Sequence, residues 1–167
     1  MKKVALLGAV AWLAARLAGA DPPAVDHQPV PCTLPEKALT LCATITSDKQ
    51  VAKARVYFRS AGEKFYSFVD MVFGGLNFCG TLPAPREGKV KTLEYYVQAI
   101  DDQFESTRTS TFQMAVQPEG ACEFPPVEKD RAKSAAITVY ATHKDQGRKL
   151  PDGFQGAGVS FVPVVRK

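Results

Sequence analysis

The chain has 167 residues, of which 46% are hydrophobic and 23% charged, and its formal net charge is +4. Three of the basic residues, Lys2, Lys3 and Arg16, belong to the first 20 residues, and the remaining 18 basic and 17 acidic residues leave a net charge of only +1. This balance excludes the clustered basic face that nucleic-acid binding requires. The length beyond residue 20 is that of one domain, or of one domain with an appendage.

Residues 1–20 have the three parts of a secretory signal peptide. Lys2 and Lys3 form a positive region, residues 4–13 are apolar, and Ala18-Gly19-Ala20 supplies small residues for cleavage after Ala20. The apolar stretch is shorter than the ~20 residues that span a bilayer, and position 21 is not the cysteine that a lipid anchor would need. The sequence therefore predicts a periplasmic or secreted protein without a stable membrane anchor.

Four cysteines remain after this cleavage: Cys32, Cys42, Cys79 and Cys122. An even number of cysteines in an exported chain is typical of disulfides, so we expect two bridges. The spacing by itself leaves three pairings open. A metal site is the alternative, but it would show a close Cys-x-x-Cys pair, and the chain has none.

After a proline-rich leader and first strand at 21–38, the chain alternates between apolar and polar residues in the way that half-buried strands do. From Leu39 to Ile45, for example, every odd-numbered position is apolar. The predicted strands are 39–45, 54–59, 66–73, 78–82, 93–99 and 111–116. Short polar turns connect them, and no amphipathic helix interrupts them, which argues against a parallel sheet with helical crossovers. We expect an all-β, antiparallel fold.

Three of these segments carry a resemblance to a known family. Val56-Tyr57-Phe58-Arg59, Phe78-x-Gly80-x-Leu82-Pro83 and Glu94-Tyr95-Tyr96-Val97-Gln98-Ala99-Ile100-Asp101 resemble core strands of the fibronectin type III-like and immunoglobulin-like domains of secreted bacterial proteins. The resemblance covers about Pro29 to Val116. It implies a single seven-stranded antiparallel sandwich, with its core over 39–122, and says little about function because such sandwiches have many roles.

The resemblance also has consequences for single residues. Tyr95 would lie near the start of the sixth strand, as in a tyrosine corner. Many relatives have a tryptophan in the third strand, whereas the only tryptophan here is Trp12 in the signal peptide. Val56 and Phe58 would have to fill that volume.

The implied strand order suggests which cysteines pair. The second and fifth strands of such a sandwich are neighbours, so Cys42 and Cys79 would bridge them on the outer face of one sheet. Cys32 precedes the sandwich and Cys122 follows it. A bond between these two would tie both ends together and close a long loop, which is worth ~4 kcal/mol in the chain-entropy model.

Residues 123–167 follow as a linker and a C-terminal β-hairpin or semi-ordered tail. Residues 135–142 and 159–165 are strand-like, and the stretch between them is polar and rich in glycine. Pro163 near the end of the second strand indicates a sheet edge. The segment would add to the edge of the sandwich or pair with a partner by strand addition.

No catalytic constellation emerges from the sequence. The two histidines, His27 and His143, lie in the leader and in a polar turn, where we expect them to be solvated rather than part of a triad. Copper could recruit both with Met71 and Met114, but Met114 is predicted to lie in the core. We therefore expect no enzyme, no metal and no cofactor.

Calcium would need several converging oxygen ligands. Asp101-Asp102, with Asp70 or Glu105, is the candidate set. Aspartates in a turn between strands more commonly accept hydrogen bonds from their own backbone, which is the interpretation we prefer.

Exposed aromatic residues are the remaining candidates for a binding site. Tyr57 and Tyr96 are predicted to point outward on strands that are neighbours in the family arrangement, and Arg55 and Arg59 flank Tyr57. These four residues could form a contact patch for a protein or a glycan. In the alternative interpretation, the arginine stems only cover the rings on a solvated sheet.

These observations predict a non-catalytic exported β-sandwich that mediates protein interaction in the bacterial envelope or outside the cell. A carbohydrate-binding module is the first alternative, although the mature chain has no tryptophan for sugar stacking. A small metal-binding periplasmic protein is the second.

Overall fold

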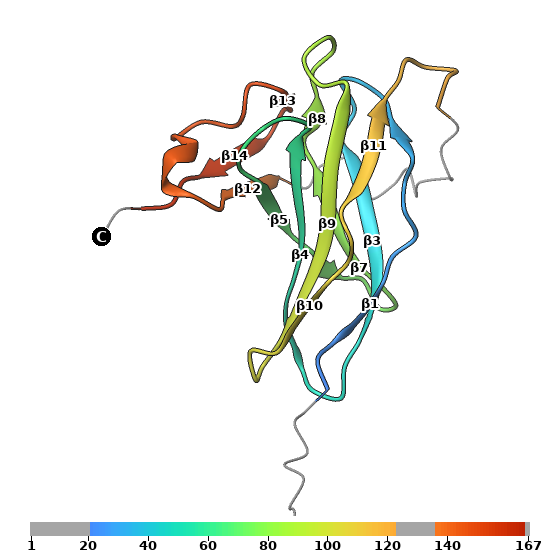
Figure 1. Cartoon of the computed structure of the whole chain (residues 1–167), viewed down its shortest axis with the longest axis vertical. Coiled ribbons are helices and arrows are strands. Elements are labelled where there is room, and N and C mark those ends of the chain that lie inside the picture. The colour runs from blue at the N-terminus through green and yellow to red at the C-terminus, as the bar shows by residue number, and fades with distance from the viewer. Residues whose placement is uncertain (1–20, 123–135, 166–167) are drawn as a thin grey trace, which may run out of the picture.

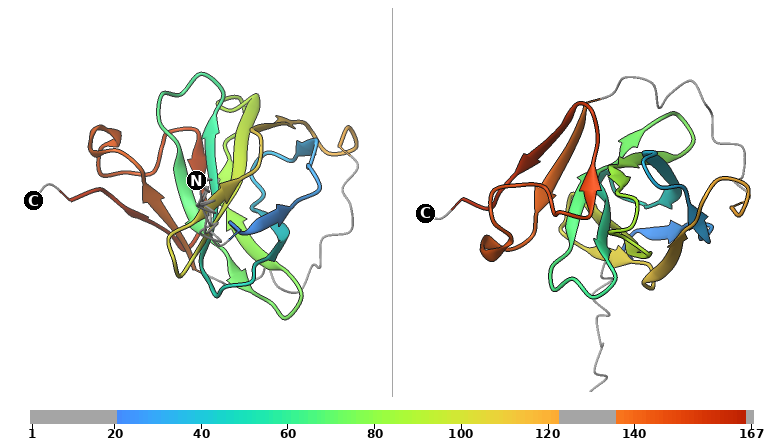
Figure 2. Two further views of the ribbon diagram at one scale, coloured as in Figure 1. Left: turned by 60° about the horizontal axis from the view of Figure 1, so that its bottom comes forward. Right: turned by 90° about the horizontal axis from the view of Figure 1, so that it is seen from above.

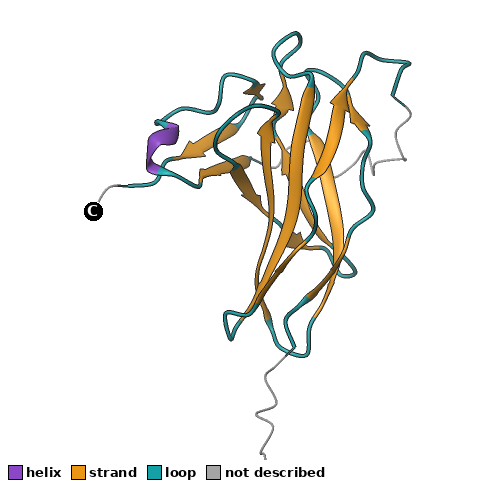
Figure 3. Cartoon of the chain, in the orientation of Figure 1, coloured by secondary structure: helices purple, strands orange, loops and turns teal. Residues whose placement is uncertain are grey.

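The computed structural model describes residues 21–122 and 136–165, and it is a β-sandwich (Figure 1). The predicted signal peptide and the linker at 123–135 lie outside the described residues. Within the described ranges there is no α-helix, and one short 3-10 turn, η1 (Lys144–Gln146), is the only helical element (Figure 3). The prediction of an all-β chain is confirmed.

Two sheets form the sandwich, and a two-stranded ribbon lies beside them. The smaller sheet has the order β1 (Ala24–Asp26), β3 (Leu39–Thr46), β7 (Phe78–Leu82) and β6 (Val72–Phe73). The larger sheet has the order β14 (Val159–Val162), β12 (Ile137–Ala141), β5 (Ser67–Asp70), β4 (Val51–Ser60), β9 (Thr92–Asp101), β11 (Phe112–Val116) and β2 (Cys32–Thr33), and β10 (Ser106–Arg108) also pairs with β9. The ribbon joins β13 (Phe154–Gln155) to β8 (Ala84–Pro85).

The core lies where the alternating strands of the two sheets face each other. Every second residue of β9 is buried, and β3 and β4 show the same period of two over most of their length. Such alternation places one face of each strand in the core. Val56 and Phe58 are fully buried, as the alternation in strand β4 predicted.

The larger sheet is wider than the seven-stranded sandwich predicted from the sequence. It has eight strands and is mixed, because β2 runs parallel to β11 and β14 runs parallel to β12. The extra width comes from the C-terminal segment, whose strand β12 pairs antiparallel with β5. A sandwich edge that a seven-stranded domain would leave open is therefore covered by this chain itself.

The C-terminal segment lies against one side of the sandwich (Figure 2). Its two strands β12 and β14 are parallel, so they are joined by a crossover that contains η1 and β13 rather than by a hairpin turn. Val139 in β12 and Phe154 in β13 are buried, and the ring of Phe154 meets that of Phe58 edge to face at 5.0 Å. This part of the chain belongs to the hydrophobic core.

Both disulfides have the pairing that the resemblance implied. Cys42 is bonded to Cys79 across β3 and β7, and Cys32 is bonded to Cys122. The described residues contain no free cysteine. Two disulfides fit an extracellular or periplasmic protein. No helix in the described ranges is long and apolar enough to cross a bilayer.

His27 is not the solvated side chain that the sequence predicted. It is half-buried, and its ring contacts those of Tyr95 and Phe112 at centroid distances of 5.6 and 5.5 Å. Its Nδ1 lies 2.8 Å from the Cys42 carbonyl oxygen, which can only accept, so Nδ1 donates. The leader is thus packed on the sandwich through β1, and its histidine is part of that packing.

Tyr95 completes this network. Its hydroxyl lies 3.0 Å from His27 Nε2, to which it donates in the neutral ring, and it accepts the Val30 backbone N–H at 2.9 Å. Burial raises the pKa of this hydroxyl, although the bond from Val30 opposes the shift. The Tyr95 hydroxyl therefore binds the N-terminal segment to the sandwich. In a tyrosine corner, by contrast, the hydroxyl bonds to the backbone only a few residues upstream.

The substitution Tyr95→Phe is expected to lower the free energy of unfolding by about 1–3 kcal/mol, because it leaves the Val30 N–H and His27 Nε2 without their partner. Chemical denaturation of the oxidised protein measures this loss. Tyr140→Phe is the matched control, since Tyr140 is only partly buried and its ring stacks on Phe68. Equal stabilities for the two variants would show that the Tyr95 network contributes nothing.

Candidate functional site

The predicted contact residues Tyr57 and Tyr96 meet on the outer face of the larger sheet. They stand directly opposite each other on β4 and β9, and their rings are stacked with centroids 4.7 Å apart and planes only 7° from parallel. Two rings lying flat on the sheet could not come so close without overlap. The rings therefore face each other, and their edges and hydroxyls are left for contact with a partner.

The row of rings continues beyond the two tyrosines. Phe68 on β5 is opposite Tyr57, with 5.3 Å between the ring centroids. Tyr140 on β12 is opposite Phe68 and stacks on it at 4.9 Å. Four aromatic side chains thus form one line across β9, β4, β5 and β12. We call this line, together with Arg55 and Arg59, the aromatic face.

Sequence reasoning missed Phe68 and Tyr140. Alternation within residues 66–73 could have indicated that Phe68 points away from the buried Ser67 and Val69. Nothing local could have placed Tyr140, because its position depends on β12 pairing with a strand about 70 residues earlier. This long-range pairing doubles the aromatic row.

Arg55 and Arg59 lie on the aromatic face, but each is already paired with an acidic side chain. The Arg55 guanidinium lies 4.3 Å from the centroid of the Phe68 ring and 3.0 Å from an Asp70 carboxylate oxygen. Arg59 lies over the Tyr66 ring at the same distance and bonds to the Glu94 carboxylate at 2.7 Å. The surface is therefore aromatic and hydrogen-bonding rather than strongly positive.

Two groups of this surface, the Tyr96 hydroxyl and the Arg55 guanidinium, have a raised pKa. Burial raises the pKa of the Tyr96 hydroxyl, and proximity to Tyr57 adds to the shift, while Arg108, 5.4 Å from the ring centroid, opposes it. Burial alone would lower the pKa of Arg55, but hydrogen bonds to Tyr57 and Asp70 outweigh that effect and raise it. The Tyr96 hydroxyl thus remains a donor at neutral pH.

The residues considered for metal or catalysis do not come together. Met71 and Met114 are buried, and His27 is engaged with Tyr95 and Cys42. His143 is exposed, stacks on Phe65 at 4.5 Å and accepts the Asp145 backbone N–H, so it caps η1. In the ranges that the structure describes, no three His, Cys, Asp or Glu residues are grouped as metal ligands would be.

Asp101, from the calcium hypothesis, acts within its own turn. The side chain is fully buried, and its Oδ1 accepts the backbone N–H groups of Gln103 and Glu105 at 2.9 Å each. Asp70 is engaged with Arg55 instead. The arrangement is that of an aspartate which closes a turn by accepting backbone hydrogen bonds.

Comparisons with known proteins do not assign a family. No protein-family model and no curated protein sequence match the chain. Among solved structures, a crystal structure of an engineered protein, Northeast Structural Genomics Consortium target OR128, aligns with 57% of this chain at 15% identity and a TM-score of 0.44. The chain spans 20% of the length of that protein. So weak a likeness supports no inference about fold or function.

Proposed function

We propose that the chain is an immunoglobulin-like or fibronectin type III-like sandwich with an added C-terminal segment. The smaller sheet, β1-β3-β7-β6, has the order A-B-E-D, and β5-β4-β9-β11 has the order C′-C-F-G. Strands β12 and β14 then extend the second sheet beyond C′. This correspondence supports the family resemblance.

The function that we propose is binding of another protein through the aromatic face, without catalysis. The observation that carries the proposal is the row of contacting rings formed by Tyr96, Tyr57, Phe68 and Tyr140, in which the two outer pairs are stacked and the middle pair is tilted. Tyrosine and arginine are enriched at the energetic centres of protein interfaces. Rings held by stacking offer a large contact area that is already ordered, so little conformational entropy is lost on binding.

The geometry favours a protein over a glycan. A sugar ring packs against the open face of an aromatic ring, and the faces of Tyr57 and Tyr96 are turned toward each other. The phenol edges and the paired arginines suit the mixed apolar and hydrogen-bonding contacts of a folded protein. Since residues 1–20 resemble a signal peptide, we place this partner in the envelope or outside the cell.

A binding comparison tests the proposal. The oxidised mature chain, residues 21–167, is immobilised and exposed to envelope extract, and the captured partner is then purified and its dissociation constant measured. The double variant Tyr57→Ser/Tyr96→Ser is expected to raise that constant about 30-fold or more, the effect of losing one interface hot spot. Circular dichroism and disulfide mapping establish that the variant is folded.

Two controls separate the surface from the fold. Tyr57→Phe/Tyr96→Phe keeps the stacked rings and isolates the contribution of the hydroxyls. Phe73→Ser/Leu76→Ser alters exposed apolar side chains on the other sheet and is expected to leave the dissociation constant unchanged. Capture of no specific protein, or equal affinity of the wild type and the serine variant, would contradict the proposal.

A further inference from the structure

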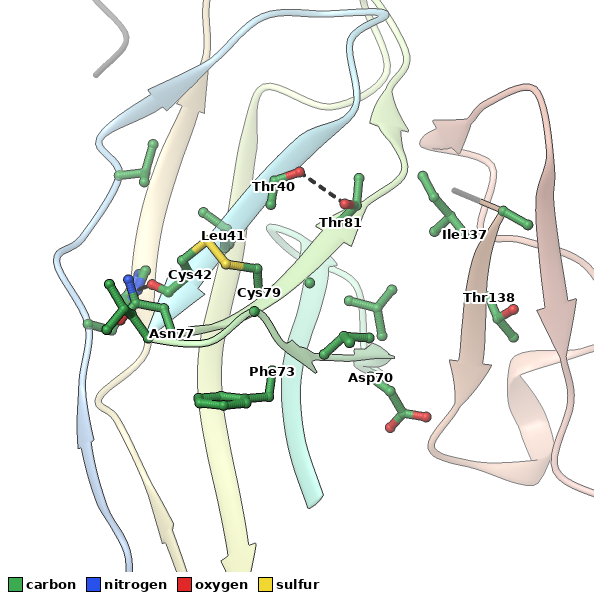
Figure 4. A pocket seen from close by; sticks show the side chains of 18 of the residues that line it. Thr40, Leu41, Cys42, Asp70, Phe73, Asn77, Cys79, Thr81, Ile137 and Thr138 are labelled. Carbon is green, nitrogen blue, oxygen red and sulfur yellow. Dashed lines mark hydrogen bonds between the residues drawn. A yellow bond between two sulfur atoms is a disulfide. The ribbon is translucent and has the colours of Figure 1, made fainter. Parts of the chain in front are cut away.

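A groove of about 1100 Å³ lies beside the smaller sheet, and the Cys42–Cys79 disulfide is part of its lining (Figure 4). Phe73 of β6 and Leu76 of the β6–β7 turn line one part of it, and Ile137 of β12 lines another. The groove extends from the smaller sheet to β5 and β12 of the larger sheet, and Tyr140 of the aromatic face is one of its lining residues. A disulfide is thus part of the wall of an accessible depression.

The two disulfides differ in their exposure. Cys32 and Cys122 retain only 8% and 9% of their accessible surface and pack with the buried Leu34. Cys42 is exposed and Cys79 is half-buried. Because thiol–disulfide exchange requires a thiolate to reach a sulfur atom, access alone favours reaction at the Cys42–Cys79 bond.

The fold does not depend on the Cys42–Cys79 bond to keep its strands together. The two cysteines are directly opposite each other in a ladder that runs from Leu39–Leu82 to Ala43–Phe78, and their Cα atoms are 4.1 Å apart. The hydroxyls of Thr40 and Thr81 add a hydrogen bond across the same two strands at 3.0 Å. Backbone pairing would therefore hold two reduced thiols side by side and ready to reoxidise.

The bond also constrains the unfolded chain less than the other one does. It joins residues 37 positions apart, whereas Cys32 and Cys122 are 90 positions apart. In the chain-entropy model, the longer link shifts the folding equilibrium constant toward the folded state about fourfold more than the shorter link does. We therefore expect cleavage of Cys42–Cys79 to cost less stability than cleavage of Cys32–Cys122, because the backbone pairing remains and the loop that opens is shorter.

We infer that Cys42–Cys79 is a thiol–disulfide exchange site whose co-reactant is a dithiol. A thiolate of the dithiol attacks the sulfur of Cys42, the more exposed partner, and forms a mixed disulfide while the Cys79 thiolate leaves. The second thiol of the reductant then displaces Cys42. The dithiol is oxidised to a disulfide, and this chain gains two electrons and two protons as two thiols, while Cys32–Cys122 stays oxidised.

Timed alkylation of the oxidised mature protein tests the inference. The protein is incubated with dithiothreitol without denaturant, quenched with iodoacetamide, and each cysteine is quantified by mass spectrometry. Cys42 and Cys79 are expected to be labelled at least about tenfold faster than Cys32 and Cys122. The far-UV circular dichroism is expected to remain native after the first pair has reacted.

A trapping experiment gives a second readout. A thioredoxin-fold dithiol protein with its resolving cysteine changed to serine should accumulate as a mixed disulfide on Cys42, and Cys42→Ser/Cys79→Ser should form no adduct. The matched variant Cys32→Ser/Cys122→Ser should still form it. Equal labelling rates for the two pairs, earlier labelling of Cys32 and Cys122, or loss of the native spectrum together with reduction of Cys42–Cys79 would overturn the inference.

Discussion

The substitution Phe154→Ala is expected to lower the free energy of unfolding by about 3–5 kcal/mol, the range for removing a buried phenylalanine ring. Phe154 is 2% exposed, and its ring contacts that of Phe58 edge to face in the hydrophobic core. Its removal leaves a cavity between the C-terminal segment and β4. Urea denaturation followed by circular dichroism measures the effect on the oxidised protein.

The matched control is Phe104→Ala. Phe104 is 88% exposed at the turn between β9 and β10, so its truncation is expected to change stability by no more than about 0.5 kcal/mol. If the two variants were equally stable, the C-terminal segment would be an appendage that contributes nothing to the core.

Replacing both Cys32 and Cys122 with alanine is expected to cost about 4–5 kcal/mol. This disulfide closes a loop with a sequence separation of 90 residues, and removing so long a constraint stabilises the unfolded chain by roughly that amount. The pair is also packed with Leu34 and Ala115, so some buried contact is lost as well. The measurement is thermal and urea unfolding under non-reducing conditions.

Cys42→Ala/Cys79→Ala provides the comparison, because its bond closes a shorter loop on an exposed surface. We expect this variant to lose less stability than the first one. A larger loss for the Cys42 and Cys79 variant would mean that the exposed bond, rather than the buried one, is the main structural link.

Most strands of the sandwich could be predicted because apolar and polar residues alternate along each of them. Alternation in β3, β4 and β9 identified the inward residues, and Val56, Phe58 and Tyr95 are all fully buried. The outward positions of Tyr57 and Tyr96 followed from the same pattern, whereas the proximity of their strands was implied by the resemblance; the two rings are stacked. The binding role of this surface stays a prediction.

The parts that sequence reasoning missed depend on contacts between distant residues. Phe154 is an isolated aromatic residue in a polar, glycine-rich stretch, and only its meeting with Phe58 makes it a core residue. His27 was expected in solvent because it lies in a proline-rich leader, yet it is bonded to Tyr95 and Cys42 on two other strands. Local pattern does not encode such tertiary contacts.

The position of β12 in the sheet has a consequence for biosynthesis. Strand β5 ends at Asp70, but its edge partner β12 begins only at Ile137. Because an exported chain emerges with its N-terminus first, β5 has an uncovered strand edge until the last segment of the chain arrives. Until then the nascent domain could pair with other chains, so premature termination in the final 30 residues would yield an aggregation-prone product rather than a shortened functional one.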